Sequence, residues 1–131
     1  MIVIIEIENS QPRMKADFRS IVAVHGLSGD SFSTWIHKET GQLWLRDFLP
    51  HSTKFSNARI LTFGYDSRAF ISPFEKATTG RVFTFAEELL GALSDKRTQA
   101  RGRPIILVGH SLGGIVIKNV SAALDKPVQT R

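Results

Sequence analysis

A serine set between glycines is the residue of this chain best suited to chemistry. The segment Gly109-His110-Ser111-Leu112-Gly113 carries a G-x-S-x-G pattern and directly follows the apolar run Ile105 to Val108. In this pattern a strand turns sharply into a helix, the serine takes a strained backbone conformation, and the glycines leave out Cβ atoms that would collide. We therefore expect Ser111 to be exposed at the apex of the turn and to act as a nucleophile.

A serine nucleophile needs a base, a group that orients the base, and hydrogen-bond donors for the oxyanion. The sequence supplies candidates for the nucleophile and the donors. The backbone N–H of Leu112 follows Ser111 at the start of the predicted helix, and a second N–H, of Leu27 or Gly26, lies in the turn after the strand Ile21 to Val24. We expect these amides to form an oxyanion hole.

Two histidines and two glycines are expected to support this arrangement. His25 ends the strand before the oxyanion turn, and Gly109 and Gly113 flank the serine. His110 directly precedes Ser111 at a strand end and should point away from it, so it is an implausible base.

Other interpretations of the same residues are possible. The glycines alone allow a tight crossing from strand to helix, with Ser111 as a passive turn residue. Phosphate binding is disfavoured because no Lys-Ser or Lys-Thr follows the glycines and Ser111 occupies the second glycine position of a dinucleotide fingerprint. The histidines form no ligand pair at metal-binding spacing, so no metal and no cofactor is expected. Asp66, at the end of another strand, is expected to cap its own turn.

Composition limits the class of protein. The 131 residues are 42% hydrophobic and 22% charged, which predicts one globular domain or part of one. Cysteine is absent, which excludes thiolate chemistry and favours an intracellular setting. No stretch approaches the roughly 18 consecutive apolar residues that span a bilayer. The net charge of +5 favours peripheral contact with anionic membranes, whereas nucleic-acid binding would rest on charge alone.

Strand-like and helix-like segments alternate along the chain, which predicts an α/β fold with a mostly parallel sheet. A long loop is expected from Ser67 to Phe83, followed by a helix whose capping box begins at Thr84. The remaining expected elements are an edge strand Met1 to Glu8, strands Ile21 to Val24, Arg59 to Phe63 and Ile105 to Val108, and helices Leu43 to Leu49 and Ile115 to Leu124, the last of them buried and ended by Pro127.

These residues resemble the α/β-hydrolase superfamily, and within it the lipase-like serine-active-site proteins of the fungal NACHT-associated type. The segments that carry the resemblance are Ile21 to Leu27, Trp44 to Pro50, Ala58 to Ser67 and Arg103 to Lys118. The resemblance implies the N-terminal part of a three-layer α/β-hydrolase fold, truncated after the helix that follows the elbow, which is the sharp turn that carries Ser111. It further implies an ester or lipid-acyl substrate, no cofactor, and association with mitochondrial or endoplasmic-reticulum membranes.

The chain departs from the family pattern after the nucleophile. In the superfamily the acid and the base follow the serine, but here Asp125 is the only acidic residue after Ser111 and no histidine follows His110. We therefore expect a serine esterase-like domain with little or no turnover in this chain. The alternative is a non-catalytic interaction module that binds lipid or a partner protein. The strand Ile105 to Val108 is expected to be left at a sheet edge, which favours self-association.

Overall fold

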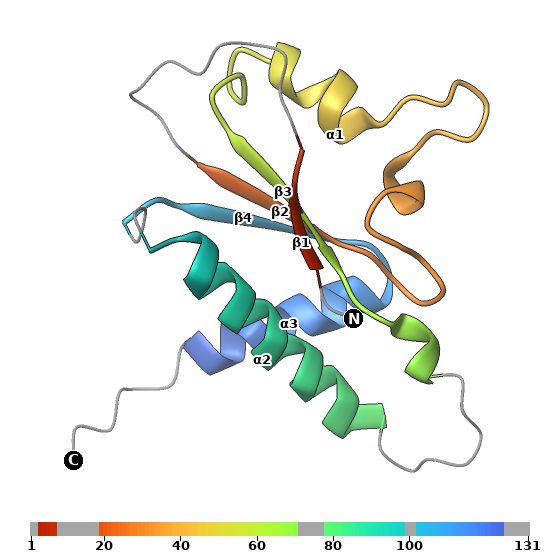
Figure 1. Ribbon diagram of the computed structural model, residues 1–131, viewed down its shortest axis with the longest axis vertical. Coiled ribbons are helices and arrows are strands. Elements are labelled where there is room, and N and C mark those ends of the chain that lie inside the picture. The colour runs from red at the N-terminus through yellow and green to blue at the C-terminus, as the bar shows by residue number, and fades with distance from the viewer. Residues whose placement is uncertain (1–2, 8–18, 71–77, 99–101, 125–131) are drawn as a thin grey trace.

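The computed structural model describes residues 3–7, 19–70, 78–98 and 102–124. It contains a four-stranded sheet in the order β1-β3-β2-β4 (Figure 1). The strands are β1 (Val3–Glu6), β2 (Ser20–Val24), β3 (Arg59–Gly64) and β4 (Ile105–Gly109). Each lies within a residue or two of its predicted position.

Most of the sheet is parallel, as predicted. The pairings of β2 with β3 and with β4 are parallel, and only β1 runs antiparallel to its neighbour β3. In the register, Val22 lies between Leu61 on one side and Leu107 on the other. The predicted α/β class is therefore confirmed, and β1 and β4 are the outer strands of the described sheet.

One face of the sheet packs against the two longer helices, α2 (Thr78–Lys96) and α3 (Leu112–Leu124). Alternate strand residues such as Val22 and Phe63 point to this face because side chains alternate along a strand. They form the larger part of the core with residues of both helices, among them Leu89, Val116 and Val120.

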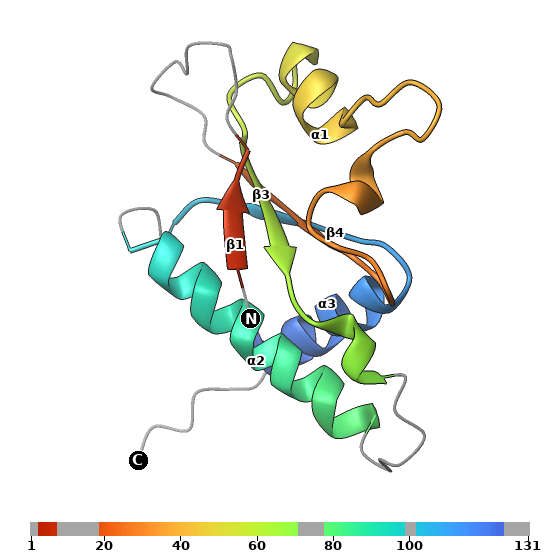
Figure 2. The same cartoon turned by 45° about the vertical axis from the view of Figure 1, so that its right-hand side comes forward.

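The opposite face carries the shorter helix α1 (Trp44–Asp47) and 3-10 turns over Ser33–Trp35 and Leu49–His51. Ala23 points to this side, one residue from Val22, and joins a second apolar cluster with Trp35, Leu45 and Ile60. Figure 2 shows α1 on one side of the sheet and α2 with α3 on the other. The described chain thus has three layers, helix, sheet and helix.

Two helix predictions were wrong in part. Helix α2 begins at Thr78, inside the expected loop, and Thr84 is not a cap, since its Oγ1 donates a hydrogen bond to the Gly80 carbonyl 3.0 Å away within the helix. A 3-10 turn over Ser67–Phe70 occupies the start of the expected loop, and residues 71–77 lie outside the described residues. Helix α3 starts at Leu112 rather than Ile115.

The remaining helices also differ in detail. The expected helix from Leu43 to Leu49 is the single turn α1 followed by a 3-10 turn that contains Pro50. Helix α3 is buried along one face only, because Ile115 and Leu124 are more than half exposed. Pro127 lies outside the described residues. None of the described helices is both long enough and apolar enough to cross a membrane.

The core contacts of α2 predict a large difference between two leucines. Leu89 is fully buried against the sheet, whereas Leu124, at the end of α3, is 67% exposed. We expect Leu89→Ala to lower the free energy of unfolding by about 2–5 kcal/mol. The matched control Leu124→Ala should change it by less than about 0.5 kcal/mol. Urea denaturation followed by tryptophan fluorescence measures both, and similar losses for the two variants would contradict this packing.

Candidate functional site

The carboxyl ends of the three parallel strands meet at one edge of the sheet and carry the candidate site. Val24 lies beside Phe63 of β3 and Gly109 of β4 in the register. The N–H of His110 donates to the Val24 carbonyl at 3.0 Å, which extends the pairing of β2 and β4 by one residue. The loops that follow these strands therefore start side by side.

The turn after β4 has the sharp geometry that the sequence predicts. Ser111 has φ 53°, in the left-handed region that non-glycine residues rarely occupy, and the residue is exposed. Hydrogen bonds of 2.9 Å run from Gly113 N to the His110 carbonyl and from Gly114 N to the Ser111 carbonyl. These bonds join the turn directly to the first turn of α3, so the strained serine is held at the corner between strand and helix.

Three glycines permit this corner. A Cβ on Gly113 would lie 2.1 Å from the Val24 carbonyl oxygen and 2.6 Å from that of His25. A Cβ on Gly109 would lie 2.6 Å from Gly114 N, inside the same turn. Helix α3 can therefore press against the end of β2 only because these positions lack side chains.

The third glycine joins the elbow to the turn after β2. A Cβ on Gly26 would lie 2.7 Å from the His110 carbonyl oxygen and 2.8 Å from Ser111 Cβ. The predicted oxyanion turn and the predicted nucleophile are thus in van der Waals contact. Gly26 and Ser111, more than eighty positions apart in the sequence, therefore lie side by side in the structure.

The oxyanion turn itself is a tight β-turn over residues 26–29. Gly29 N donates to the Gly26 carbonyl at 3.1 Å, and Ser28 has φ 56° at the third position, as in a type II turn. The Leu27 side chain is 49% exposed. Leu112 is the first residue of α3, where N–H groups have no acceptor within the helix. The oxyanion roles of Leu27, Gly26 and Leu112 stay predictions.

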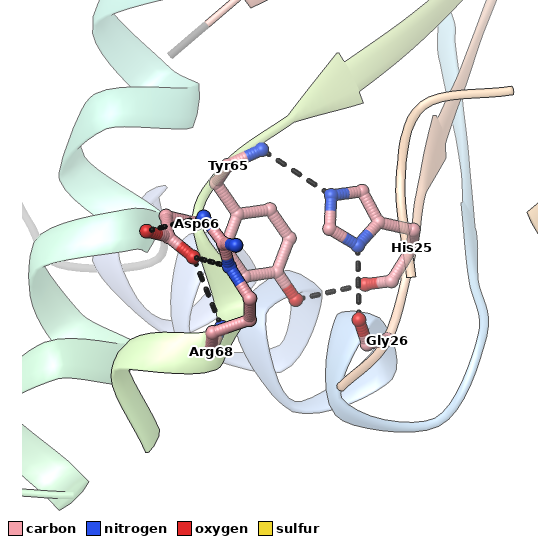
Figure 3. Close-up of polar contacts among 5 residues, drawn as sticks. All are labelled: His25, Gly26, Tyr65, Asp66 and Arg68. Carbon is pink, nitrogen blue, oxygen red and sulfur yellow. Dashed lines mark hydrogen bonds and ion pairs between the residues drawn. The ribbon is translucent and has the colours of Figure 1, made fainter. Parts of the chain in front are cut away.

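His25 is a buried support for this turn. Its side chain is 1% exposed and its ring stacks on the Tyr65 ring at 4.4 Å (Figure 3). Nδ1 lies 2.9 Å from the Gly26 carbonyl oxygen and Nε2 accepts from Tyr65 N–H at 3.3 Å, which places the proton on Nδ1. Because both ring nitrogens are occupied, His25 is not placed to act as a base for Ser111.

Tyr65 completes the support and was missed by the sequence reasoning. Its hydroxyl donates to the His25 carbonyl at 2.8 Å, as Figure 3 shows, and its ring contacts those of Phe63 and Phe85. Burial raises the pKa of Tyr65 to about 12, so the phenol keeps its proton and remains a donor at neutral pH. The only available signal was an aromatic residue directly after Gly64 at a strand end.

The remaining polar candidates have structural partners. The exposed ring of His110 meets the Trp35 ring edge-to-face at 6.3 Å, and no hydrogen bond joins it to Ser111 in the described part of the chain. Asp66 accepts from Arg68 N at 3.2 Å and Arg68 Nε at 3.0 Å, so it does cap its turn, as expected. The guanidinium of Arg68 lowers the pKa of Asp66. Among the described residues no cluster of metal-ligating side chains occurs.

Comparison with known proteins yields one relative. No family model matches the sequence, and no solved structure matches it. The chain is similar to Protein SERAC1 of Danio rerio. The two are 30% identical over 130 residues, an alignment that covers 85% of this chain and 18% of that protein. The chain therefore spans less than a fifth of the length of the relative that it matches.

The glycine contacts predict opposite effects for two adjacent substitutions. Gly113→Ala places a methyl group against two backbone carbonyls, whereas a Cβ on Gly114 meets nothing within 4 Å. We expect Gly113→Ala to lower the free energy of unfolding by about 3 kcal/mol, the upper end of the usual cost of overpacking. Gly114→Ala, within the same helix, should raise it by about 0.5–1 kcal/mol. Equal tolerance of both variants in thermal and urea denaturation would be incompatible with the close approach of α3 to β2.

The burial of Tyr65 predicts a high titration midpoint that can be read directly, because Tyr65 is the only tyrosine of the chain. Tyrosinate absorbance should rise with a midpoint near pH 12 in the folded protein and near 10 in urea. Since the folded pKa is the higher one, its contribution to stability is complete below about pH 10 and is lost as the pH rises through about 12. A midpoint near 10 with circular dichroism unchanged would show the phenol to be solvated.

Proposed function

We propose that this chain carries the nucleophile and oxyanion-binding part of a serine ester hydrolase of the lipase or esterase type. The observation that carries the proposal is the contact between two strained turns. Ser111, at φ 53°, is exposed on the elbow, and Gly26 of the oxyanion turn packs against its Cβ. Similarity to Protein SERAC1 and the three-layer α/β architecture support the same class.

In the proposed reaction Ser111 Oγ attacks the carbonyl carbon of an ester while a base removes its proton. The carbonyl oxygen becomes an oxyanion that accepts hydrogen bonds from the N–H groups of Leu112 and of Leu27 or Gly26. The bond from carbonyl carbon to ester oxygen then breaks, the alcohol leaves with a proton, and water releases the acid from the serine. One aligned donor contributes roughly a hundred- to a thousandfold in rate.

The base is the unassigned part of this mechanism. Both ring nitrogens of His25 are engaged, by the Gly26 carbonyl and by the Tyr65 N–H, so His25 is not assigned as the base. The second candidate is a hydrolase-derived module that binds a lipid or a partner protein without turnover. In either case the hydroxyl and the amide donors face the same ligand, so the two candidates differ in whether acyl transfer to Ser111 occurs.

The proposed substrate is an ester or a lipid-acyl group, and the proposed location is intracellular, at the surface of a mitochondrial or endoplasmic-reticulum membrane. The net charge of +5 supports contact with an anionic bilayer. Exposed apolar side chains on and after the oxyanion turn, Leu27 and Phe32, support contact with lipid. Self-association is proposed through β4, which pairs only with β2 among the described strands and exposes Ile106.

A serine-directed fluorophosphonate tests the nucleophile. The phosphonyl group should attach to Ser111, slowly in buffer and faster when imidazole is added as an external base. Mass spectrometry locates the adduct and gives its rate. Ser111→Ala should abolish labelling, and Ser94→Ala, which removes another exposed serine, should leave it unchanged.

Two results would contradict the proposal of an esterase-type nucleophile. One is an adduct distributed over several serines, and the other is labelling that persists in Ser111→Ala. Rapid labelling without imidazole would instead contradict the expectation that this chain lacks an effective base. The interaction module would be favoured if Ser111→Ala still bound a lipid or a partner protein and the unsubstituted chain formed no phosphonate adduct.

A further inference from the structure

A polar cavity adjoins the oxyanion turn. It has a volume of about 430 Å³ and lies between the loop after β2 and the loop after β3. The lining residues are Ser28, Gly29, Asp30, Tyr65, Asp66, Ser67 and Arg68. Part of this wall is seen in Figure 3, where Asp66 and Arg68 lie beside the Tyr65 ring. One turn, residues 26–29, thus contacts the elbow through Gly26 and the cavity through Ser28 and Gly29.

The carboxylates that line the cavity interact with residues of the same loops that carry them. Asp30 accepts hydrogen bonds from the Ser33 hydroxyl and, at 2.8 Å, from the N–H groups of Phe32 and Ser33. The hydroxyl first and then the two N–H groups lower the pKa of the Asp30 carboxyl. Asp66 is paired with Arg68 at 3.0 Å. Two carboxylates and one guanidinium leave a net negative charge, which disfavours an anionic ligand. A cation is disfavoured beside Asp66, because the Arg68 guanidinium that pairs with this carboxylate would repel it.

One group in the wall has no partner. Ser67 is 2% exposed, and its hydroxyl forms no hydrogen bond to any described residue. A buried hydroxyl that forms no hydrogen bond lowers the stability of the folded state, so its presence in a folded protein needs an explanation. Ser67 is one of the residues that line the cavity, so a change of its side-chain rotamer is the movement that would bring the hydroxyl within reach of a ligand there. A ligand hydroxyl that enters there supplies the missing partner.

We propose that this cavity binds a neutral polyhydroxylated group, of the glycerol or sugar kind. Ser67 Oγ and the N–H groups of Arg68 not directed at Asp66 would donate to it, and Asp66 Oδ2, whose Arg68 contact is a long 3.4 Å, would accept from it. Vicinal hydroxyls match this alternation of donors and acceptors. Phosphate is disfavoured because its negative charge would lie beside two carboxylates, and an alkylammonium group offers no acceptor to Arg68.

The place of the cavity next to the elbow indicates which part of an ester substrate the polyhydroxylated group belongs to. This step rests on the proposed function. An ester whose carbonyl carbon lies at Ser111 has its oxygen at the oxyanion turn, and the cavity opens beside that same turn. The polyhydroxylated group is then the alcohol portion of the ester, the portion that leaves when Ser111 is acylated. Binding of the group itself does not require acyl transfer.

Amide-resolved NMR titration of the 131-residue chain tests the proposal. The probes are glycerol, glycerol monooctyl ether, octanol, tetramethylammonium and inorganic phosphate. Glycerol and its ether should shift the amide signals of Ser28, Gly29 and Ser67 in a saturable manner, and octanol, tetramethylammonium and phosphate should not. If the ether binds more tightly than glycerol, the polyhydroxylated group belongs to a lipid headgroup. If the two bind with equal affinity, it is a free polyol.

Substitutions separate this site from the nucleophile. Ser67→Ala and Arg68→Gln should each weaken binding of the ether by about two- to tenfold, the loss expected for one hydrogen bond. The matched control Arg46→Gln removes another exposed arginine paired with a neighbouring aspartate, at 2.8 Å, and should leave binding unchanged. Ser111→Ala should also retain it, so a failure of the nucleophile proposal leaves this measurement intact.

Several results would overturn the polyol site. These are shifts caused by tetramethylammonium or phosphate in place of glycerol, octanol binding as well as the ether, unchanged affinity in both Ser67→Ala and Arg68→Gln, or no saturable shift at these amides with any polyol probe. Shifts at these amides with glycerol and no phosphonate adduct at Ser111 would keep the cavity and refute the esterase.

Discussion

The close approach of helix α3 to the end of strand β2 is the constraint on which the site depends. Gly113 lies so near the Val24 and His25 carbonyls that the smallest side chain would overlap them. This contact fixes the direction in which the chain leaves β4 and forces Ser111 into its left-handed conformation. The burial of both sheet faces stabilises the strand and the helix between which the strained serine lies, and the hydrogen bonds of the turn hold it at the corner.

A second layer of support lies beneath the turn over residues 26–29, the predicted oxyanion turn. His25 and Tyr65 connect β2 to β3 through a ring stack and two hydrogen bonds, so the turn rests on a buried aromatic pair. The same histidine holds the Gly26 carbonyl. A histidine next to an active-site turn is commonly considered for catalysis, and here its two nitrogens are both used to position backbone.

Sequence patterns predicted those parts of the molecule that local rules control. Apolar runs located the strands, and the spacing of Gly109, Ser111 and Gly113 located the sharp corner. The capping box at Thr84 was misleading because a threonine hydroxyl also bonds to a carbonyl four residues earlier within a helix, as it does to Gly80. Tyr65 could not be identified because its partners are a backbone carbonyl and a ring forty residues away, which leave no local pattern.

The proposed function requires that amides at the corner around Ser111 bind an oxyanion, and a crystal structure of the phosphonate adduct measures this directly. In that adduct we expect the phosphoryl oxygen to lie about 2.7–3.1 Å from the amide nitrogen of Leu112 and from that of Leu27 or Gly26. Ser111 keeps its positive φ in that adduct. A phosphoryl oxygen that points to solvent, with neither amide within hydrogen-bond distance, would contradict the central claim.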